Sequence, residues 1–136
     1  MEKLQLEVVT PAKVVVKAEV DMVVAPGTEG EFGVLPGHVL FLSGIIPGEL
    51  RYTTGTQKEL LAVSSGFAEI SNDRVSILVE AAEKATDIDV ERAERAAERA
   101  KERMAKDRAT EDIDFKRAEA ALQRALIRLK VAQKTQ

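Results

Sequence analysis

The arginines in the C-terminal third of the chain have a spacing that could bind phosphate groups. At about 100° per residue on a helix, Arg92, Arg99 and Arg103 lie within about 40° of one another. Guanidinium groups pair bidentately with phosphate oxygens, so an arginine row of this kind suits a triphosphate. The alternative is a solvated helix surface, because acidic and basic residues also recur at i,i+3 and i,i+4 spacing. Those pairs are Asp89–Arg92, Glu91–Arg95, Arg99–Glu102 and Glu102–Lys106.

Two glycine-containing segments carry the other groups of interest. The acidic segment Glu29–Gly33 is typical of a hairpin loop in which Gly30 and Gly33 supply positive φ. Pro36-Gly37 predicts a turn directly before the single histidine, His38. No serine, cysteine or carboxylate lies beside this histidine in the sequence, which favours a structural or surface role for it.

The composition argues against several kinds of site. The chain has no cysteine, which excludes disulfides and thiolate metal sites, and one histidine argues against a zinc site. It has no phosphate-binding loop of the G-x-x-x-x-G-K-[ST] kind and no visible set of nucleophile, base and orienting group. With no tryptophan and one tyrosine, it lacks aromatic residues interleaved with bases for nucleic-acid stacking. We therefore expect no catalytic residue, no metal, no required cofactor and no nucleic-acid partner.

Charge divides the chain into two parts. Residues 1–86 carry 12 acidic and 7 basic residues, whereas residues 87–136 carry 11 acidic and 13 basic residues. The last 21 residues alone carry 6 basic residues and 1 acidic residue. This asymmetry predicts two parts with different partners.

No segment of the sequence resembles a membrane span or a signal peptide. There is no apolar run of about 18 residues, and the segment Met1–Leu4 does not lead into the apolar core of a signal peptide. We therefore expect a cytoplasmic protein that does not insert into a membrane.

Residues 1–86 have the period-two pattern of β-strands. Apolar and polar residues alternate over Leu4–Val8 and again over Val14–Met22. All eight glycines and all four prolines precede residue 67, and Ser71-Asn72-Asp73 predicts a hairpin. Short strands separated by turns every 8–12 residues or so predict a β-sandwich or barrel. The other turn signals are Pro26-Gly27, Pro36-Gly37, Pro47-Gly48 and Thr54-Gly55.

Residues 87–136 contain no glycine or proline and have the spacing of packed helices. Two series of apolar residues recur at alternating intervals of three and four, and the polar stretch Lys106–Asp112 between them predicts a turn. The pattern predicts an antiparallel helical hairpin. Because alanine seams bury little area, we expect the hairpin to be marginally stable and able to open. The seams are Val90, Ala93, Ala97, Ala100 and Met104, and Phe115, Ala118, Leu122, Ala125, Leu129 and Ala132.

A short repeat marks the expected start of each helix. The segment Asp87–Glu94 recurs 25 residues later as Asp112–Glu119. An aspartate at a helix start accepts hydrogen bonds from backbone N–H groups that have no partner within the helix. Helix capping therefore explains at least part of the repeat.

Two motifs resemble a known family. The string Glu29-Gly30-Glu31-Phe32-Gly33-Val34-Leu35-Pro36-Gly37-His38 resembles the loop signature of the epsilon subunit of bacterial F-type ATP synthases. The string Val63-Ser64-Ser65-Gly66-Phe67-Ala68-Glu69-Ile70 resembles a second strand motif of that family. The resemblance covers essentially the whole chain. It implies an α+β fold in which an antiparallel β-sandwich of ten strands, residues 1–86, precedes an antiparallel α-helical hairpin, residues 87–136.

The resemblance also implies partners and their contacts. The sandwich would bind the rotating shaft subunit, gamma, through His38, and the membrane-embedded c-ring through Glu29, Gly30 and Glu31. The hairpin would either lie folded against the sandwich or extend toward the catalytic alpha and beta subunits, where it would block ATP hydrolysis. The complex would lie peripherally at the cytoplasmic face of the bacterial plasma membrane. The residues expected to make the inhibitory contact are Lys116, Arg117, Arg124 and Arg128.

ATP is a possible regulatory ligand of the hairpin. The segment Ile88–Ala93 matches the I/L-D-x-x-R-A motif with which some epsilon subunits bind ATP, although Ile113–Ala118 fits the same motif. Bound ATP would be sensed and not hydrolysed. The alternative function is a free-standing ATP-sensing or adaptor module outside any rotor. The site implied by the family consists of Glu83, Ile88, Asp89, Arg92, Ala93 and Arg99, with Arg124 and Arg128 from the second helix.

Overall fold

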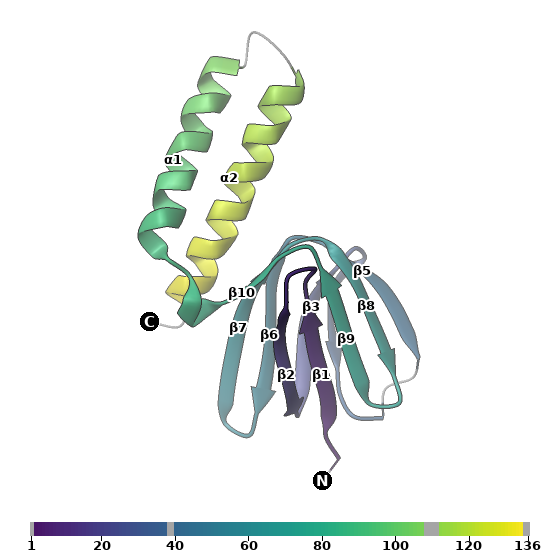
Figure 1. Ribbon diagram of the computed structural model, residues 1–136. Coiled ribbons are helices and arrows are strands. Elements are labelled where there is room, and N and C mark those ends of the chain that lie inside the picture. The colour runs from purple at the N-terminus through teal and green to yellow at the C-terminus, as the bar shows by residue number, and fades with distance from the viewer. Residues whose placement is uncertain (1, 38–39, 108–111, 135–136) are drawn as a thin grey trace. The chain divides into compact units, whose positions relative to one another are not determined.

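The chain forms two compact units. The computed structural model describes residues 2–37, 40–107 and 112–134. One unit spans Met1–Ala85 and the other Thr86–Gln136, so the boundary lies one residue before the predicted one. The first unit consists of strands and the second of helices (Figure 1). The predicted fold class, a β-sandwich followed by a helical hairpin, is confirmed.

Ten strands form one continuous sheet in the first unit. Their order is β10-β7-β6-β3-β5-β8-β9-β1-β2, with β4 added on β3. β2, at one end of this order, lies near β6 and β10 toward the other end, so the sheet closes on itself around its core. The strands are β1 (Leu4–Val9), β2 (Val14–Val20), β3 (Met22–Gly27), β4 (Gly30–Val34), β5 (Phe41–Ile45), β6 (Gly48–Thr54), β7 (Gln57–Val63), β8 (Gly66–Ser71), β9 (Arg74–Val79) and β10 (Ala82–Lys84).

The core of the strand unit is aliphatic. The period-two pattern places alternate side chains inside, where each buried Val, Leu or Ile contributes about 1.5–3 kcal/mol relative to an exposed one. In β1, for example, Leu4, Leu6 and Val8 are fully buried and the residues between them are not. The largest fully buried side chains of this unit are Leu4, Leu6, Val8, Val20, Val23, Val34, Leu50, Leu61, Ile70, Val75 and Ile77.

One pair of strands departs from the predicted antiparallel arrangement. β1 and β9 are parallel, with Leu6 opposite Val75 and Val8 opposite Ile77. A parallel pair needs a long connection, and here β2 to β8 lie between the two strands in sequence. The pairing therefore joins the start of the unit to its end.

The turns agree with the sequence signals except at Pro26-Gly27. Asn72 and Asp73 have φ of 51° and 60°, the signature of a two-residue type I′ hairpin turn between β8 and β9. Pro26-Gly27, in contrast, lies inside β3 and not in a turn. β3 pairs with β6 at Met22–Val24 and with β5 at Gly27. Pro26 lies between these two pairings, where β3 has changed from one neighbouring strand to another, and a proline without an N–H donor is tolerated at such a position.

Two antiparallel helices form the second unit. A short 3₁₀ turn, η1 (Ala85–Asp87), precedes α1 (Val90–Asp107), and α2 (Asp112–Gln133) lies beside α1 (Figure 1). Both helices therefore extend into the predicted turn Lys106–Asp112, whose residues 108–111 lie outside the described part of the chain. Neither helix, over its described residues, is long and apolar enough to span a membrane.

Alanine makes the buried part of both helical seams. Of the predicted seam positions the alanines are buried, whereas larger residues such as Phe115, Leu122 and Leu129 are half-buried. Small side chains let two helices approach closely, but they bury little apolar area. This agrees with the expectation of a marginal hairpin. The buried seam alanines are Ala93, Ala97, Ala100, Ala118, Ala125 and Ala132.

Candidate functional site

The acidic segment predicted to contact the c-ring forms the tip and start of the β3–β4 hairpin. Gly30 has φ of 113°, as expected, and pairs with Gly27 across the hairpin. Gly33 does not have the predicted positive φ, because it lies in extended strand β4 opposite Val24. Glu29, Gly30 and Glu31 are all exposed.

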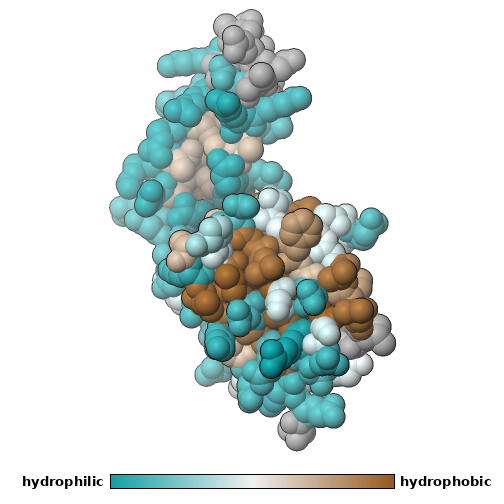
Figure 2. Space-filling view, turned by 45° about the vertical axis from the view of Figure 1, so that its right-hand side comes forward, coloured by the Kyte–Doolittle hydropathy of each residue, from teal (hydrophilic) through white to brown (hydrophobic). Residues whose placement is uncertain are grey.

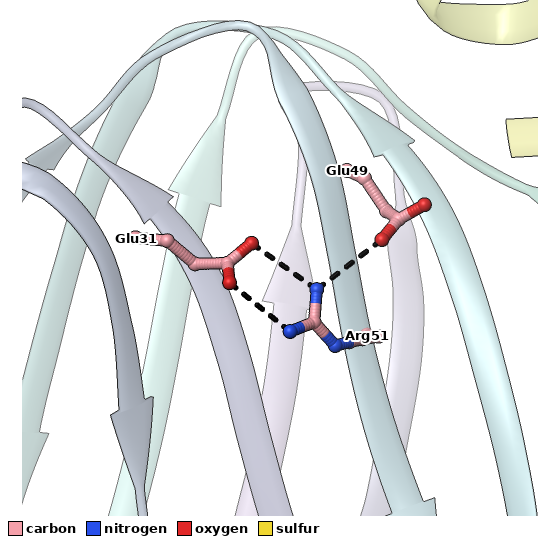
Figure 3. A network of polar contacts seen from close by, with 3 residues as sticks. All are labelled: Glu31, Glu49 and Arg51. Carbon is pink, nitrogen blue, oxygen red and sulfur yellow. Dashed lines mark hydrogen bonds and ion pairs between the residues drawn. The ribbon is translucent and has the colours of Figure 1, made fainter. Parts of the chain in front are cut away.

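The carboxylate of Glu31 is held by an arginine of the same chain. Arg51 of β6 reaches across β3, and its Nη1 and Nη2 lie 3.1 and 3.0 Å from the two carboxylate oxygens of Glu31 (Figure 3). Its Nη1 also lies 3.3 Å from Oε2 of Glu49, two residues earlier on the same strand. Hydrogen bonding to Glu31 raises the pKa of Arg51 most, with a further contribution from Glu49, while burial lowers it.

This three-residue network is a feature that sequence reasoning missed. Glu49 and Arg51 are two apart on a strand, so the alternation rule places both on one face. Their pairing with Glu31 depends on the order β6-β3-β4, which no local signal reveals. The sequence predicts that Glu31 contacts basic groups of a partner. Because Arg51 of the same chain already contacts the Glu31 carboxylate, such a partner would meet an ion pair and not a lone carboxylate.

An apolar surface covers part of the outer face of β5, β8 and β9. Leu42, Phe67 and Leu78, here called the apolar patch, are 69%, 71% and 53% exposed. β8 lies between β5 and β9. Phe67 of β8 lies opposite Leu78 of β9, and Leu42 of β5 lies opposite Glu69 of β8. The patch lines a shallow concavity. Figure 2, which brings this side of the strand unit forward, shows hydrophobic side chains gathered there.

Gly66 explains part of the second sequence motif. A Cβ at this position would lie 1.9 Å from the carbonyl oxygen of Leu78, so the close approach of β8 and β9 requires glycine. The close approach holds the next residue, Phe67, directly opposite Leu78.

The predicted gamma contact, His38, lies outside the described residues. The turn that precedes it is described. Gly37 has φ of 88°, as in the turn predicted at Pro36-Gly37, and its N–H donates to Oδ1 of Asp73 at 2.7 Å. Asp73 belongs to the β8–β9 turn, so this hydrogen bond ties two loops together.

The start of the Ile88–Ala93 motif serves as a helix cap. Oδ1 of Asp89 accepts the backbone N–H of Arg92 at 3.0 Å, and the Asp89 carbonyl accepts the N–H of Ala93 at 3.0 Å. The capping interpretation is therefore confirmed for Asp89. The Asp89 carboxylate accepts from the Arg92 backbone and not from the Arg92 side chain. The Asp89–Arg92 side-chain pair predicted from the spacing is therefore wrong. Ile88 and Ala93 are buried.

The arginines of the expected ATP site lie on both helices. Arg92, Arg99 and Arg124 are exposed and Arg128 is half-buried. The antiparallel arrangement places the start of α1 beside the end of α2, so residues of both helices can face one ligand (Figure 1). Glu83, in contrast, lies in β10 of the strand unit, opposite Ala62.

The solvated-surface interpretation also has support along α1. Arg95 lies 4.0 Å from Glu91, which confirms that predicted pair, and Lys101 lies 3.8 Å from Glu98. The basic residues expected to inhibit hydrolysis lie on α2, where Lys116, Arg117 and Arg124 are exposed. Among the described residues, no group of three or more histidine, cysteine or acidic side chains could hold a metal ion.

The chain consists of a β-sandwich unit and a helical hairpin unit, and comparison with known families agrees with this arrangement. The model of the ATP synthase delta/epsilon chain β-sandwich domain matches residues 3–85. The model of the long α-helix domain of the same chains matches residues 86–133. The chain belongs to the ATP synthase delta/epsilon chain family, which confirms the family expected from the two motifs.

Curated relatives and solved structures extend the comparison. An ATP synthase epsilon chain of Syntrophobacter fumaroxidans is 54% identical over 134 residues, 98% of each chain. One of Carboxydothermus hydrogenoformans is 53% identical over 105 residues, 77% of this chain and 78% of the relative.

The fold also occurs in two mitochondrial assemblies. A chain of the Euglena gracilis ATP synthase OSCP/F1/c-ring structure has a TM-score of 0.79 at 24% identity, covering 98% of this chain and 81% of that one. A chain of the Tetrahymena thermophila central stalk/c-ring structure has a TM-score of 0.60 at 13% identity, covering 98% and 96%. At these identities the likeness concerns the fold alone.

Proposed function

We propose that the chain is a central-stalk subunit of a bacterial F-type ATP synthase. It joins the shaft subunit, gamma, to the c-ring and regulates ATP hydrolysis without catalytic residues of its own. Support comes from the family models, from relatives named ATP synthase epsilon chain, and from neighbours in F1/c-ring and central-stalk assemblies. The protein would then be peripheral at the cytoplasmic face of the membrane, as part of the complex.

The apolar patch is the observation that carries this proposal. Large apolar side chains exposed together are uncommon on monomers and mark interaction surfaces. Leu42, Phe67 and Leu78 lie on one sheet face, and covering the exposed part of each would contribute a fraction of the ~1.5–3 kcal/mol that full burial of such a side chain provides. We assign this face to the gamma subunit, with His38 as a further contact. The family implies two partners for the sandwich, gamma and the c-ring, and we assign the c-ring to the β3–β4 hairpin.

The test is binding of purified gamma to the full chain. Replacing Phe67 with glutamate puts a charge at the most exposed position of the patch. We expect the affinity for gamma to fall by about tenfold or more. A loss of about 1.4 kcal/mol of binding free energy corresponds to a tenfold higher Kd. Thr56→Glu, at an exposed position in the β6–β7 turn, is the matched control and should bind normally. Equal binding by both variants would overturn the assignment, and failure of the chain to co-purify with membrane-bound ATPase would favour a free-standing adaptor.

The β3–β4 hairpin is the proposed c-ring contact. Glu29, Gly30 and Glu31 are exposed on it, and the bidentate ion pair with Arg51 orients the Glu31 carboxylate. An exposed ion pair between Glu31 and a basic group of the c-ring would contribute only about 0–1 kcal/mol. The β3–β4 hairpin would therefore set the orientation of the chain on the c-ring more than its affinity for the c-ring.

The helical unit is the proposed regulatory part. Three of the four inhibitory residues, Lys116, Arg117 and Arg124, are exposed on α2 and suit an acidic surface of the catalytic alpha and beta subunits. Arg128, the fourth, is half-buried. Replacing all four with alanine should raise ATP hydrolysis by the assembled complex. Unchanged hydrolysis in complexes that contain the variant would contradict this role.

ATP sensing is the second part of the regulatory proposal. The exposed Arg92 and Arg99 on α1 and Arg124 on α2 could pair with phosphate oxygens when the helices lie side by side. Asp89 would contribute by capping α1, and so by holding Arg92 in the helix. Bound ATP would stabilise the closed hairpin and thereby weaken inhibition.

A further inference from the structure

The tip of the β3–β4 hairpin is held against β5 by two backbone hydrogen bonds. The Thr28 N–H donates to the Gly44 carbonyl at 3.0 Å, and the Ile46 N–H donates to the Pro26 carbonyl at 3.0 Å. The end of β3 therefore pairs with β5 as well as with β4. Thr28 is exposed and is the first residue of the turn that follows β3, so its own N–H fixes where that turn begins on β5.

The Thr28 side chain occupies the space beside Gly44 that a side chain at that position would need. A Cβ at Gly44 would lie 2.7 Å from Cγ2 of Thr28, closer than real Cβ atoms come to other heavy atoms. Gly44 does not have the positive φ that would itself require glycine. Glycine at this position therefore serves the close approach of Thr28, and the two residues fit together as a pair.

This contact lies on the face of the sheet that carries the apolar patch. Gly44 of β5 is directly opposite Phe67 of β8, and Leu42 lies two residues earlier on β5. Opposite residues of an antiparallel pair point to the same face, with Cβ positions about 4.5–5.5 Å apart. Phe67 is 71% exposed on the outer face, so the space above Gly44 also belongs to that face. The Thr28 methyl group therefore lies next to the Phe67 position.

The concavity of the apolar patch extends to the same point. Gly44 lines this concavity together with Leu42, Phe67 and Leu78. Because Gly44 is also the residue against which Thr28 packs, Thr28 stands at the rim of the concavity. A partner that covered the patch would reach the tip of the β3–β4 hairpin.

We propose that Thr28 is a positioning residue that seats the tip of the β3–β4 hairpin on the outer face of β5, so that the gamma contact and the c-ring contact lie on one rigid surface. The proposal rests on the functions proposed above for the patch and the hairpin. The c-ring segment Glu29–Glu31 directly follows Thr28 in the chain. A contact surface that is ordered before binding lowers the entropic cost of association, so gamma would bind a fixed tip more tightly than a displaced one.

The experiment uses two substitutions, of which the first removes the fit and the second restores it. Gly44→Ala adds a methyl group 2.7 Å from Cγ2 of Thr28 and displaces that side chain. Gly44→Ala/Thr28→Ser keeps the added methyl group but removes Cγ2, and the nearest remaining atom, Oγ1, lies at an ordinary 3.4 Å. We expect purified gamma to bind Gly44→Ala about three- to tenfold more weakly than the parent, and the double variant within about twofold of the parent.

Gly33→Ala is the matched control in the same hairpin. A Cβ at Gly33 would meet no atom closer than 3.9 Å, so this variant should bind gamma as the parent does. If the double variant binds as weakly as Gly44→Ala, the added methyl group acts directly on gamma and the positioning role is wrong. Binding is compared at a temperature at which thermal unfolding shows every variant to be folded.

Hydrogen exchange of the residue 28 amide provides a second readout that does not depend on gamma. This N–H donates to the Gly44 carbonyl, so its protection should fall in Gly44→Ala and return in the double variant. Unchanged protection in Gly44→Ala would overturn the proposal. Phe67→Glu serves as the reference for gamma binding. If Phe67→Glu binds normally, the assignment of the patch fails, and if it binds weakly while Gly44→Ala binds normally, only the role of Thr28 fails.

Discussion

At the scale of single residues, Arg51 fastens an edge strand to the sheet. β4 pairs only with β3 among the described strands, and Arg51 links it to β6 through two contacts with Glu31. A lysine ammonium cannot reproduce the planar bidentate geometry. We expect Arg51→Met and Arg51→Lys each to lower the free energy of unfolding by about 0.5–1.5 kcal/mol, measured by urea denaturation.

A double-mutant cycle checks whether Glu31 is the partner responsible. Glu31→Gln should cost little in the Arg51→Met background, because the contact is already lost there. If the two losses were instead additive, the stability effect of Arg51 would have to come from Glu49 or from packing of its aliphatic stem.

Asp21 is the residue with the clearest expected pH dependence. Hydrogen bonds from Lys3 and from the Gly55 N–H lower the pKa of Asp21 below its ordinary value of 3.8. A carboxyl whose pKa is lower in the folded state stabilises the fold above its unfolded pKa. That contribution is lost as the pH falls below 3.8 and through the folded value. Asp21→Asn should therefore unfold more easily than the parent at neutral pH, with the difference shrinking as the pH falls through this window.

The measurement is the thermal midpoint of unfolding as a function of pH. Glu80→Gln, which changes an exposed carboxylate of the same unit, is the control. A constant difference between Asp21→Asn and the parent at every pH would show that the shifted titration of Asp21 does not contribute.

At the scale of elements, sequence reasoning succeeded where geometry depends on neighbouring residues. The β8–β9 hairpin follows from Asn72-Asp73, because these residue types tolerate positive φ. The alanine seams follow from helical periodicity, and the start of α1 follows from a capping aspartate, Asp89. Each of these signals lies within a few residues of the structure that it predicts.

Features that depend on distant parts of the chain could not be predicted in this way. The ion pair between Glu31 and Arg51 requires the strand order β6-β3-β4, and the parallel pairing of β1 with β9 requires the whole topology. Pro26-Gly27 has a turn composition, yet β3 continues through it because the strand changes partner there. The hydrogen bond from Gly37 to Asp73 likewise joins two turns that were predicted separately.

The N-terminus of α1 offers a prediction about one element. Asp89→Ala removes the side-chain acceptor for the Arg92 N–H and should destabilise the helix by about 1 kcal/mol. Asp89→Ser keeps a good capping group and should retain most of the stability. Helical content followed by circular dichroism during heating is the measurement, and an unchanged transition in Asp89→Ala would contradict capping as the role of this residue.

At the scale of the whole molecule, the two units have different physical character. The strand unit has a dense aliphatic core, whereas the helical unit is held largely by alanine contacts. The strand unit is acidic, and the last 21 residues carry 6 basic residues and 1 acidic residue. Under the proposed function, the densely packed strand unit would bind the rotor, and the more weakly packed helical unit would change conformation.

ATP sensing is the role proposed above for the hairpin. When the helices are closed, basic side chains of α1 and α2 share one unit, and an anion would offset their mutual repulsion. A ligand that binds only the closed form stabilises it by RT ln(1 + [L]/Kd), about 2.7 kcal/mol at a hundredfold excess over Kd. A hairpin with equal populations of the closed and extended forms in the absence of ATP would then be almost wholly closed. High ATP would release the inhibition, and low ATP would let the helices extend and stop hydrolysis.

Calorimetric titration of the chain with ATP tests this sensor. We expect heat of binding at millimolar ATP or below for the parent and its loss in Arg92→Ala/Arg99→Ala, because two exposed guanidinium groups are removed. Arg95→Ala is the matched control, since Arg95 is also exposed on α1 but pairs with Glu91. Equal binding by the double variant, or no binding by the parent, would contradict ATP sensing. If the parent does not bind ATP, the only role left for the Ile88–Ala93 motif is to cap helix α1 through Asp89.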